Sequence, residues 1–150
     1  MAIGTIMTAQ VSETLWYEGK EHGMCSEPLN VYFDLTGERP KFAEMDTSCW
    51  RGYVGEWEIR DDRLYLIGLE GRLVDGEEAT LESIFPGFPD RVLAHWYSGT
   101  VRVPEGELLD YVHGGYLSTY ERDVFLTFEK GVLVGTETRK NNPPDTDMSF

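Results

Sequence analysis

The feature that most constrains the fold is the stretch from residue 49 to residue 76, which predicts β structure almost without a break. From Tyr53 to Ile59, apolar and aromatic residues alternate with a second set that contains two glutamates, as in a strand with one buried and one solvent-facing side. The charged residues 60–62 predict a turn. Residues 64–69 are apolar at nearly every position, which predicts a second strand covered on both faces. We expect the chain to be organised around these two strands.

The rest of the chain predicts further strands, separated by glycine, proline and charged turns. Short apolar runs with period-two alternation are typical of strands. Asp75-Gly76 closes the central unit with a tight turn, and Gly131 is placed for a left-handed turn position. The predicted elements are hairpins over residues 8–24 and 123–138, strands over residues 29–35, 91–103 and 107–113, turns at residues 104–106 and 129–131, and one helical turn over residues 80–85.

These elements predict an all-β fold with at most one short helical turn, in which an antiparallel meander forms a β-sandwich or a barrel-like domain. The pattern is compatible with both architectures. A chain of 150 residues suits one domain with one core. We expect a single β-rich domain over residues 1–138, followed by a flexible, polar, proline-containing C-terminal tail over residues 139–150.

The composition is strongly acidic. Thirteen basic and 27 acidic side chains give a formal net charge of −14 at pH 7. This charge repels nucleic acids and anionic membrane surfaces, so neither is expected as a partner. A basic protein is the expected macromolecular partner. The alternative is that the charge does no more than keep an aromatic-rich domain in solution.

Cysteine usage and hydropathy bear on the cellular compartment. Cys25 and Cys49 are too few for a disulfide scaffold, so both are expected to be free thiols. No window approaches the roughly 18 uncharged apolar residues of a membrane span. The N-terminus also lacks the pattern of a secretory signal. We therefore expect a cytoplasmic protein.

The least generic polar run lies at residues 113–123, where His113, Tyr116, Tyr120 and Arg122 occur close together. In an enzyme, His113 would transfer a proton, Arg122 would hold an anionic group of the substrate, and a tyrosine would donate a hydrogen bond. The alternative is a histidine at a bend, with tyrosines that pack across strands and an arginine paired with carboxylates of the chain. We expect the alternative, because clusters of titratable groups are more often structural than catalytic.

Two aromatic segments are further candidates for binding. His95, Trp96 and Tyr97 are expected on one strand, with His95 and Tyr97 on the same face, as the wall of a pocket or as part of the core. Arg51, next to Trp50, is expected either to reach an anionic ligand or to neutralise nearby carboxylates. The candidate binding residues are therefore Trp50, Arg51, His95, Trp96, Tyr97, His113 and Tyr116.

No metal or cofactor site is expected. His22 and Cys25 have a possible ligand spacing, but no second pair accompanies them, whereas structural zinc sites show paired ligands. The sequence contains no glycine-rich nucleotide loop, no nucleophile elbow and no HExxH motif.

Three functional hypotheses follow, in order of preference. The first is a small, acidic, non-catalytic protein that binds or masks a basic partner protein, as inhibitors and immunity proteins do. The second is a β-barrel that binds a small molecule. The third is an enzyme that uses the cluster at residues 113–123. The fold alone does not decide among them.

Overall fold

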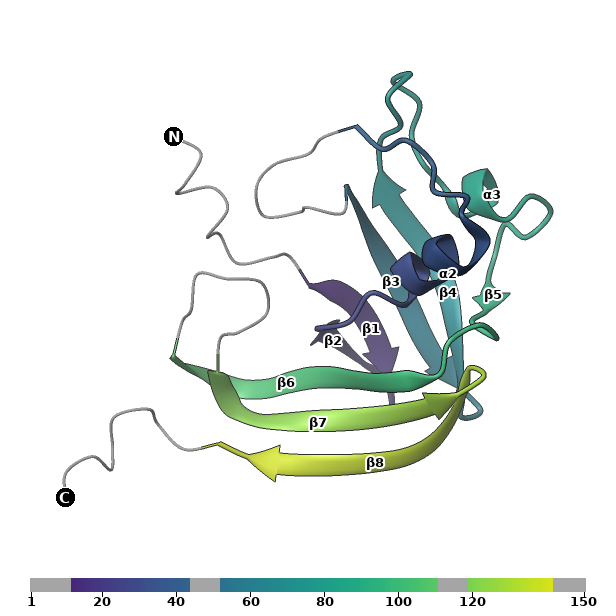
Figure 1. Cartoon of the computed structure of the whole chain (residues 1–150). Helices are drawn as coiled ribbons and strands as arrows, with labels where there is room; N and C mark the ends of the chain where they lie inside the picture. The colour runs from purple at the N-terminus through teal and green to yellow at the C-terminus, as the bar shows by residue number, and fades with distance from the viewer. Residues whose placement is uncertain (1–11, 44–51, 111–118, 142–150) are drawn as a thin grey trace.

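The structure is a computed structural model, and it describes residues 12–43, 52–110 and 119–141. Strands dominate these residues, and two short helices accompany them (Figure 1). The elements are β1 (Glu13–Tyr17), β2 (Lys20–Met24), α2 (Pro28–Thr36), β3 (Tyr53–Arg60), β4 (Arg63–Gly71), α3 (Leu81–Ile84), β5 (Val92–Leu93), β6 (Gly99–Asp110), β7 (Thr119–Glu129) and β8 (Val132–Lys140).

The strands form one mixed sheet with the order β2-β1-β3-β4-β8-β7-β6, and β5 pairs with β4 beside this path. The described pairs are antiparallel except for β1 and β3, which run parallel. The sheet is not closed into a barrel. Its two ends nevertheless approach each other, since the Cys25 amide donates to the Arg102 carbonyl at 2.9 Å. The all-β class is confirmed, and the parallel pair is an addition to the expected meander.

Three hairpins turn through pairs of residues with positive φ, as a two-residue type I′ turn requires. Such turns match the right-handed twist of the flanking strands and so fix which residues face each other. All three lie where the sequence predicted turns or hairpins. The φ values are +54° and +78° at Glu18 and Gly19, +53° and +59° at Asp61 and Asp62, and +52° and +82° at Lys130 and Gly131.

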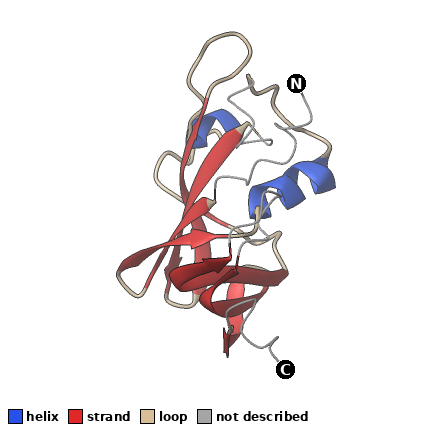
Figure 2. Ribbon diagram, turned by 90° about the vertical axis from the view of Figure 1, so that its left-hand side faces the viewer, coloured by secondary structure: helices blue, strands red, loops and turns tan. Residues whose placement is uncertain are grey.

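The core lies against the inner face of the sheet. Figure 1 places α2 over β3 and β4, and Figure 2 shows the helices beside the strands. Phe33 of α2 meets Tyr53 of β3 edge to face, with ring centroids 6.0 Å apart. Burial of one such large apolar side chain stabilises the fold by about 1.5–3 kcal/mol. The other fully or almost fully buried apolar residues include Leu15, Met24, Leu29, Trp57, Leu64, Leu66, Ala94, Val101, Val103, Leu126 and Phe128.

One carboxylate lies inside this core. Glu13 of β1 is fully buried, and its Oε2 accepts from the Gly55 amide of β3 at 2.7 Å. Its Oε1 accepts from the indole Nε1 of Trp57 at 3.0 Å. A Cβ at position 55 would lie 2.6 Å from Oε1, so the glycine makes room for the carboxylate. Glu13 therefore joins β1 to β3 in addition to their backbone pairing.

The prediction of a strand over residues 29–35 is wrong, because this segment is the helix α2. The helix has Pro28 in its first turn, where the fixed φ of proline suits a helix and its missing amide hydrogen leaves no bond unmade. It ends at Gly37, which has a φ of +71° and donates its amide to the Phe33 carbonyl at 2.8 Å. Leu29 and Phe33 lie four residues apart, so one face of the helix supplies both to the core.

The predicted helical turn is confirmed as α3, whereas a long predicted strand is broken. α3 begins after Thr80, whose hydroxyl accepts from the Ser83 amide at 3.3 Å. β5 ends at Leu93 and β6 begins only at Gly99, so a turn interrupts the strand predicted over residues 91–103. That turn carries three of the candidate binding residues.

β6 continues through residues 104–106, so the turn predicted there is wrong. Gly106 has a φ of +87° and lies where the register of the β6–β7 ladder shifts, which is the geometry of a β-bulge. Pro104 is tolerated because β6 is the last strand in the order of the sheet. At the other end of the chain, β8 extends to Lys140 and so includes the first two residues of the segment 139–150.

Candidate functional site

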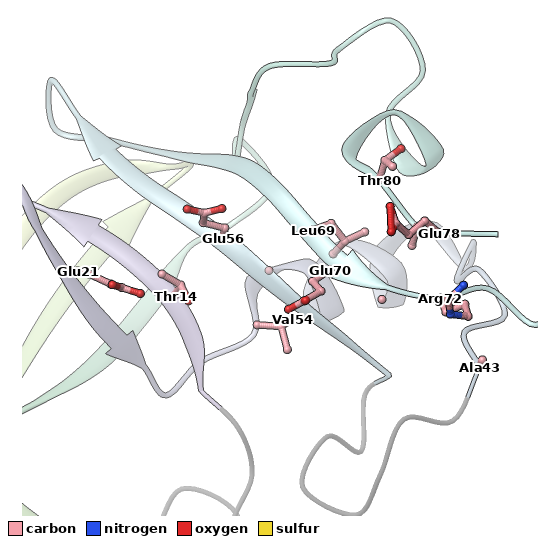
Figure 3. A pocket seen from close by; sticks show the side chains of 13 residues that line it. Thr14, Glu21, Ala43, Val54, Glu56, Leu69, Glu70, Arg72, Glu78 and Thr80 are labelled. Carbon is pink, nitrogen blue, oxygen red and sulfur yellow. The ribbon is translucent and has the colours of Figure 1, made fainter. Parts of the chain in front are cut away.

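A wide cleft of about 880 Å³ lies on the outer face of the sheet, over β1, β3 and β4 (Figure 3). Side chains alternate along a strand, so Val54 and Glu56 point away from the core that contains Tyr53 and Trp57. The cleft also receives residues from β2 and from the segment that leads into α3. Its lining residues are Thr14, Glu21, Ala43, Val54, Gly55, Glu56, Leu69, Glu70, Gly71, Arg72, Glu78, Ala79 and Thr80.

Carboxylates dominate the charge of this cleft. The sheet order places Glu21 of β2, Glu56 of β3 and Glu70 of β4 along one surface, although they are far apart in the sequence. Glu78 adds a fourth carboxylate next to the end of β4, where the backbone of Glu78 forms an isolated antiparallel β-bridge with that of Arg72. The cleft lining therefore contains four acidic side chains and one basic side chain. This arrangement attracts cationic groups and repels anions.

The position of Glu56 is well defined. Its Oε2 accepts from the indole Nε1 of Trp16 on the neighbouring strand at 2.7 Å. Its Oε1 lies over Gly68 of β4, and a Cβ at position 68 would lie only 3.1 Å from that oxygen. In the sheet, Glu56 lies opposite Thr14 of β1 on one side and opposite Gly68 of β4 on the other. Its side chain therefore lies in the middle of the cleft. The carboxylate is thus held in place by a neutral donor.

Arg72, the basic residue of the cleft, bonds to backbone groups of nearby residues. Its guanidinium Nη1 donates to the Gly76 carbonyl at 3.1 Å. Its carbonyl accepts from the Ala43 amide at 2.7 Å. Over the described parts of the chain, no ion pair joins Arg72 to a glutamate of the cleft. Among the described residues, Arg72 therefore does not neutralise the carboxylates of the cleft.

The cleft has the chemistry of a binding surface. Its oxygens come from glutamates and from the hydroxyls of Thr14 and Thr80, which can accept hydrogen bonds from ammonium and guanidinium groups. Within the described ranges, no group of three or more histidine, cysteine, aspartate or glutamate side chains is arranged to hold a metal ion. Sequence reasoning missed this site. Glu56 and Glu58 alternate with apolar residues, and this pattern indicated a polar face of the strand. Nothing in the sequence indicated that Glu21 or Glu78 lies on the same surface as Glu56.

A second polar group of residues lies where the two ends of the sheet meet, and it contains Arg122 of the predicted cluster. The Nε of Arg122 donates to Glu105 Oε1 of β6 at 3.1 Å, and His22 Nδ1 of β2 lies 3.7 Å from the other oxygen of Glu105. Next to them, Arg102 Nε donates to Asp123 Oδ1 at 2.8 Å. Arg122 is thus engaged by carboxylates of its own chain.

The other members of the predicted polar cluster are only partly described. The carbonyl of Tyr120 accepts from Asn141 Nδ2 at 2.9 Å, which ties β7 to the end of β8. His113 and Tyr116 lie outside the described residues, as do Trp50 and Arg51 of the central unit. The catalytic hypothesis for His113 therefore stays a prediction.

The aromatic candidates at residues 95–97 are arranged differently from the prediction. They form a turn, in which His95 is exposed and Tyr97 is buried, so the expectation that these two share a face is wrong. Trp96 stacks on Phe85 with ring centroids 5.6 Å apart, and its indole donates to the Pro28 carbonyl at 2.8 Å. Trp96 and Tyr97 therefore pack in or against the core instead of lining the cleft.

The buried position of Cys25, which follows β2, shifts the pKa of its thiol. Desolvation by burial raises the pKa of its thiol to about 11, while Arg102 opposes this rise and Asp123 adds to it. Burial likewise raises the pKa of Tyr97. The folded state holds both protons more tightly than the unfolded state. The contribution of Cys25 to stability is therefore complete below about pH 9 and is lost as the pH rises through about 11, and the contribution of Tyr97 is likewise lost at alkaline pH.

We expect iodoacetamide to alkylate Cys25 slowly in the folded protein. A Cys49→Ser variant isolates this thiol, and at pH 8 its rate should be roughly a hundredfold lower without urea than in urea, because the thiolate fraction falls with the raised pKa. Mass spectrometry against time measures both rates. Equal rates in the two conditions would contradict the buried environment of the thiol.

Comparison of the chain with protein-family models, with curated proteins and with solved protein structures finds no match. In the part of the chain that the structure describes, no helix has the length and apolar character needed to cross a bilayer. The functional argument therefore rests on the geometry and charge of the cleft.

Proposed function

We propose that this protein is a small, acidic, non-catalytic binding protein whose cleft on β1, β3 and β4 takes a basic segment of a partner protein. The observation that carries the proposal is the gathering of Glu21, Glu56, Glu70 and Glu78 on one surface with a single arginine. Occupation of the cleft by lysine or arginine side chains would mask a basic surface of the partner. Inhibitors and immunity-like proteins act in this way.

The chemistry of the cleft favours a basic protein segment over a drug-sized ligand. Pockets for small molecules are mostly apolar, with few polar groups. Here the glutamates and threonines supply hydrogen-bond acceptors across four neighbouring strands, a span that suits an extended chain. The overall charge of −14 would also accelerate association with a basic partner at low ionic strength.

Reversal of two cleft charges tests the proposal. A Glu70→Lys/Glu78→Lys variant should bind an oligolysine peptide at least about tenfold more weakly than the native chain, because two attractive contacts become repulsive. The same variant should lose the basic proteins that the native chain retains from a lysate at low salt and releases as salt rises. Isothermal titration calorimetry and a salt-gradient pull-down measure the two effects.

A matched control separates the cleft from the net charge. Asp34→Lys/Glu129→Lys makes the same change in charge at two exposed residues of α2 and β7, neither of which lines the cleft. This control should bind within about twofold of the native chain, as expected for distant surface charges. Equal weakening in both variants would show that the general charge, and not the cleft, attracts the peptide.

A further inference from the structure

β8 has one edge that the described residues leave largely without a strand partner. Along one side it pairs with β7 from Val132 to Lys140. On the other side its pairing with β4 is limited to Arg63 opposite Val132, and the Leu133 amide donates to the Asp62 carbonyl at 2.7 Å. Beyond that point β8 diverges from β4 and lies at the border of the sheet (Figure 1).

The ladder with β7 shows which backbone groups this edge presents. The Asn141 amide donates to the Glu121 carbonyl of β7 at 2.9 Å. The register is unbroken from Thr136 to Lys140, and in an antiparallel ladder alternate residues bond to the same neighbour. Glu137 and Arg139 therefore bond toward β7, whereas Thr136, Thr138 and Lys140 direct their amides and carbonyls toward the open edge.

The edge segment carries one acidic and one basic side chain on either side of Thr138. Glu137 and Arg139 lie on the same face, with Arg139 Nη2 3.4 Å from Glu137 Oε2, and their side chains are 65% and 62% exposed. Charged residues on an edge usually prevent pairing with another chain. Here, however, one acidic and one basic residue flank Thr138 at equal distances, so the segment is complementary to itself when it is inverted.

We propose that β8 pairs with β8 of a second copy of this chain, antiparallel and centred on Thr138. In this register Thr138 exchanges backbone hydrogen bonds with the partner's Thr138, and Thr136 does so with the partner's Lys140. Glu137 then faces the partner's Arg139 at a position without backbone bonds, where facing side chains lie closest. A shift by one pair in either direction puts Glu137 opposite the partner's Glu137 or Arg139 opposite the partner's Arg139, which disfavours both alternatives.

Charge reversal at these two positions tests the pairing and its register. Glu137→Arg and Arg139→Glu, made separately, each put like charges opposite one another and should raise the dissociation constant of the dimer about tenfold or more. The Glu137→Arg/Arg139→Glu double variant should restore the native constant. A mixture of the two single variants should form a heterodimer, because each variant then faces its opposite charge.

Sedimentation equilibrium from about 1 μM to about 1 mM protein, at about 0.15 M ionic strength to screen the net charge, measures these constants. Asp34→Arg and Arg60→Glu make matched changes in charge outside the pairing segment 136–140 and should leave the constant within about twofold. A native chain that stays monomeric over this range overturns the proposal, as does a dimer that the single variants do not weaken. Glu137 and Arg139 are not part of the cleft, so failure here leaves the proposed function untouched.

Discussion

Replacement of Glu13 by alanine should lower the free energy of unfolding by roughly 2–5 kcal/mol. Two buried donors, the Gly55 amide and the Trp57 indole, lose their acceptor, and each unsatisfied donor costs about 1–3 kcal/mol. The cavity left between β1 and β3 adds to this loss. Urea titration followed by tryptophan fluorescence measures the change.

Two controls isolate the role of the buried carboxylate. Glu13→Gln keeps the shape and one acceptor oxygen but turns an amide nitrogen toward a donor, so it should cost about half as much as Glu13→Ala. Glu21→Ala removes an exposed glutamate from the adjoining strand and should change stability by less than about 0.5 kcal/mol. Equal costs for Glu13→Ala and Glu21→Ala would contradict a role for Glu13 in joining the strands.

Replacement of Gly131 by alanine should lower the free energy of unfolding by roughly 2–4 kcal/mol. The turn at Gly131 docks on the turn at residues 94–98, since the Gly131 amide donates to the Tyr97 carbonyl at 2.9 Å. A Cβ at position 131 would lie 2.7 Å from the carbonyl oxygen of Ala94. That oxygen belongs to the backbone of a buried residue, so relief of the clash requires the two turns to separate.

Gly19→Ala is the matched control, because Gly19 holds the same position in the hairpin of β1 and β2. Its φ of +78° is close to the +82° of Gly131, but a Cβ there meets nothing within 4 Å. The strain of the left-handed conformation alone should cost about 1 kcal/mol. Asp62 adopts a φ of +59° at the equivalent turn position, so a side chain is tolerated there. Equal losses for Gly131→Ala and Gly19→Ala in thermal denaturation would rule out the contact with Ala94.

The hairpins are the part of the fold that the sequence predicts well, because their signals are local. Lys130-Gly131 and Asp61-Asp62 lie between alternating apolar runs, and each turn decides the register of its two strands. Gly106 shows the limit of this reasoning. The sequence predicted a turn at residues 104–106, yet Gly106 has a positive φ inside a continuous β6, where it serves a bulge.

The helix α2 was missed although its boundaries are marked. Pro28 at the start and Gly37 after the end are typical helix signals. The segment between them is short and rich in aromatic and β-branched residues, which favour strands when read alone. Packing of Leu29 and Phe33 on the sheet overrides that preference.

The acidic cleft was not predictable from sequence, because its members meet only through tertiary structure. Glu56 and Glu70 lie on paired strands, but Glu21 reaches the same surface only through the parallel pairing of β1 with β3. A parallel pair leaves no turn signal in the sequence, since its strands are joined by a long crossover. The net charge of −14 showed that the chain has an excess of acidic side chains, but it did not indicate which of them lie together on the folded surface.

The parallel pair of β1 and β3 also bears on the order in which the strands are expected to assemble. The hairpins β1–β2, β3–β4 and β7–β8 each close a loop of two residues. The pairing of Thr14 with Glu56, in contrast, closes a loop that contains the whole chain segment between these two residues. Closing a long loop costs more chain entropy, and contacts between distant residues slow folding. We therefore expect the contacts within the hairpins to form before the pairing of β1 with β3. In this order, the attachment of β1 to β3 and the burial of the Glu13 carboxylate are expected to come late, so loss of the β1–β3 contact should be an early event in unfolding.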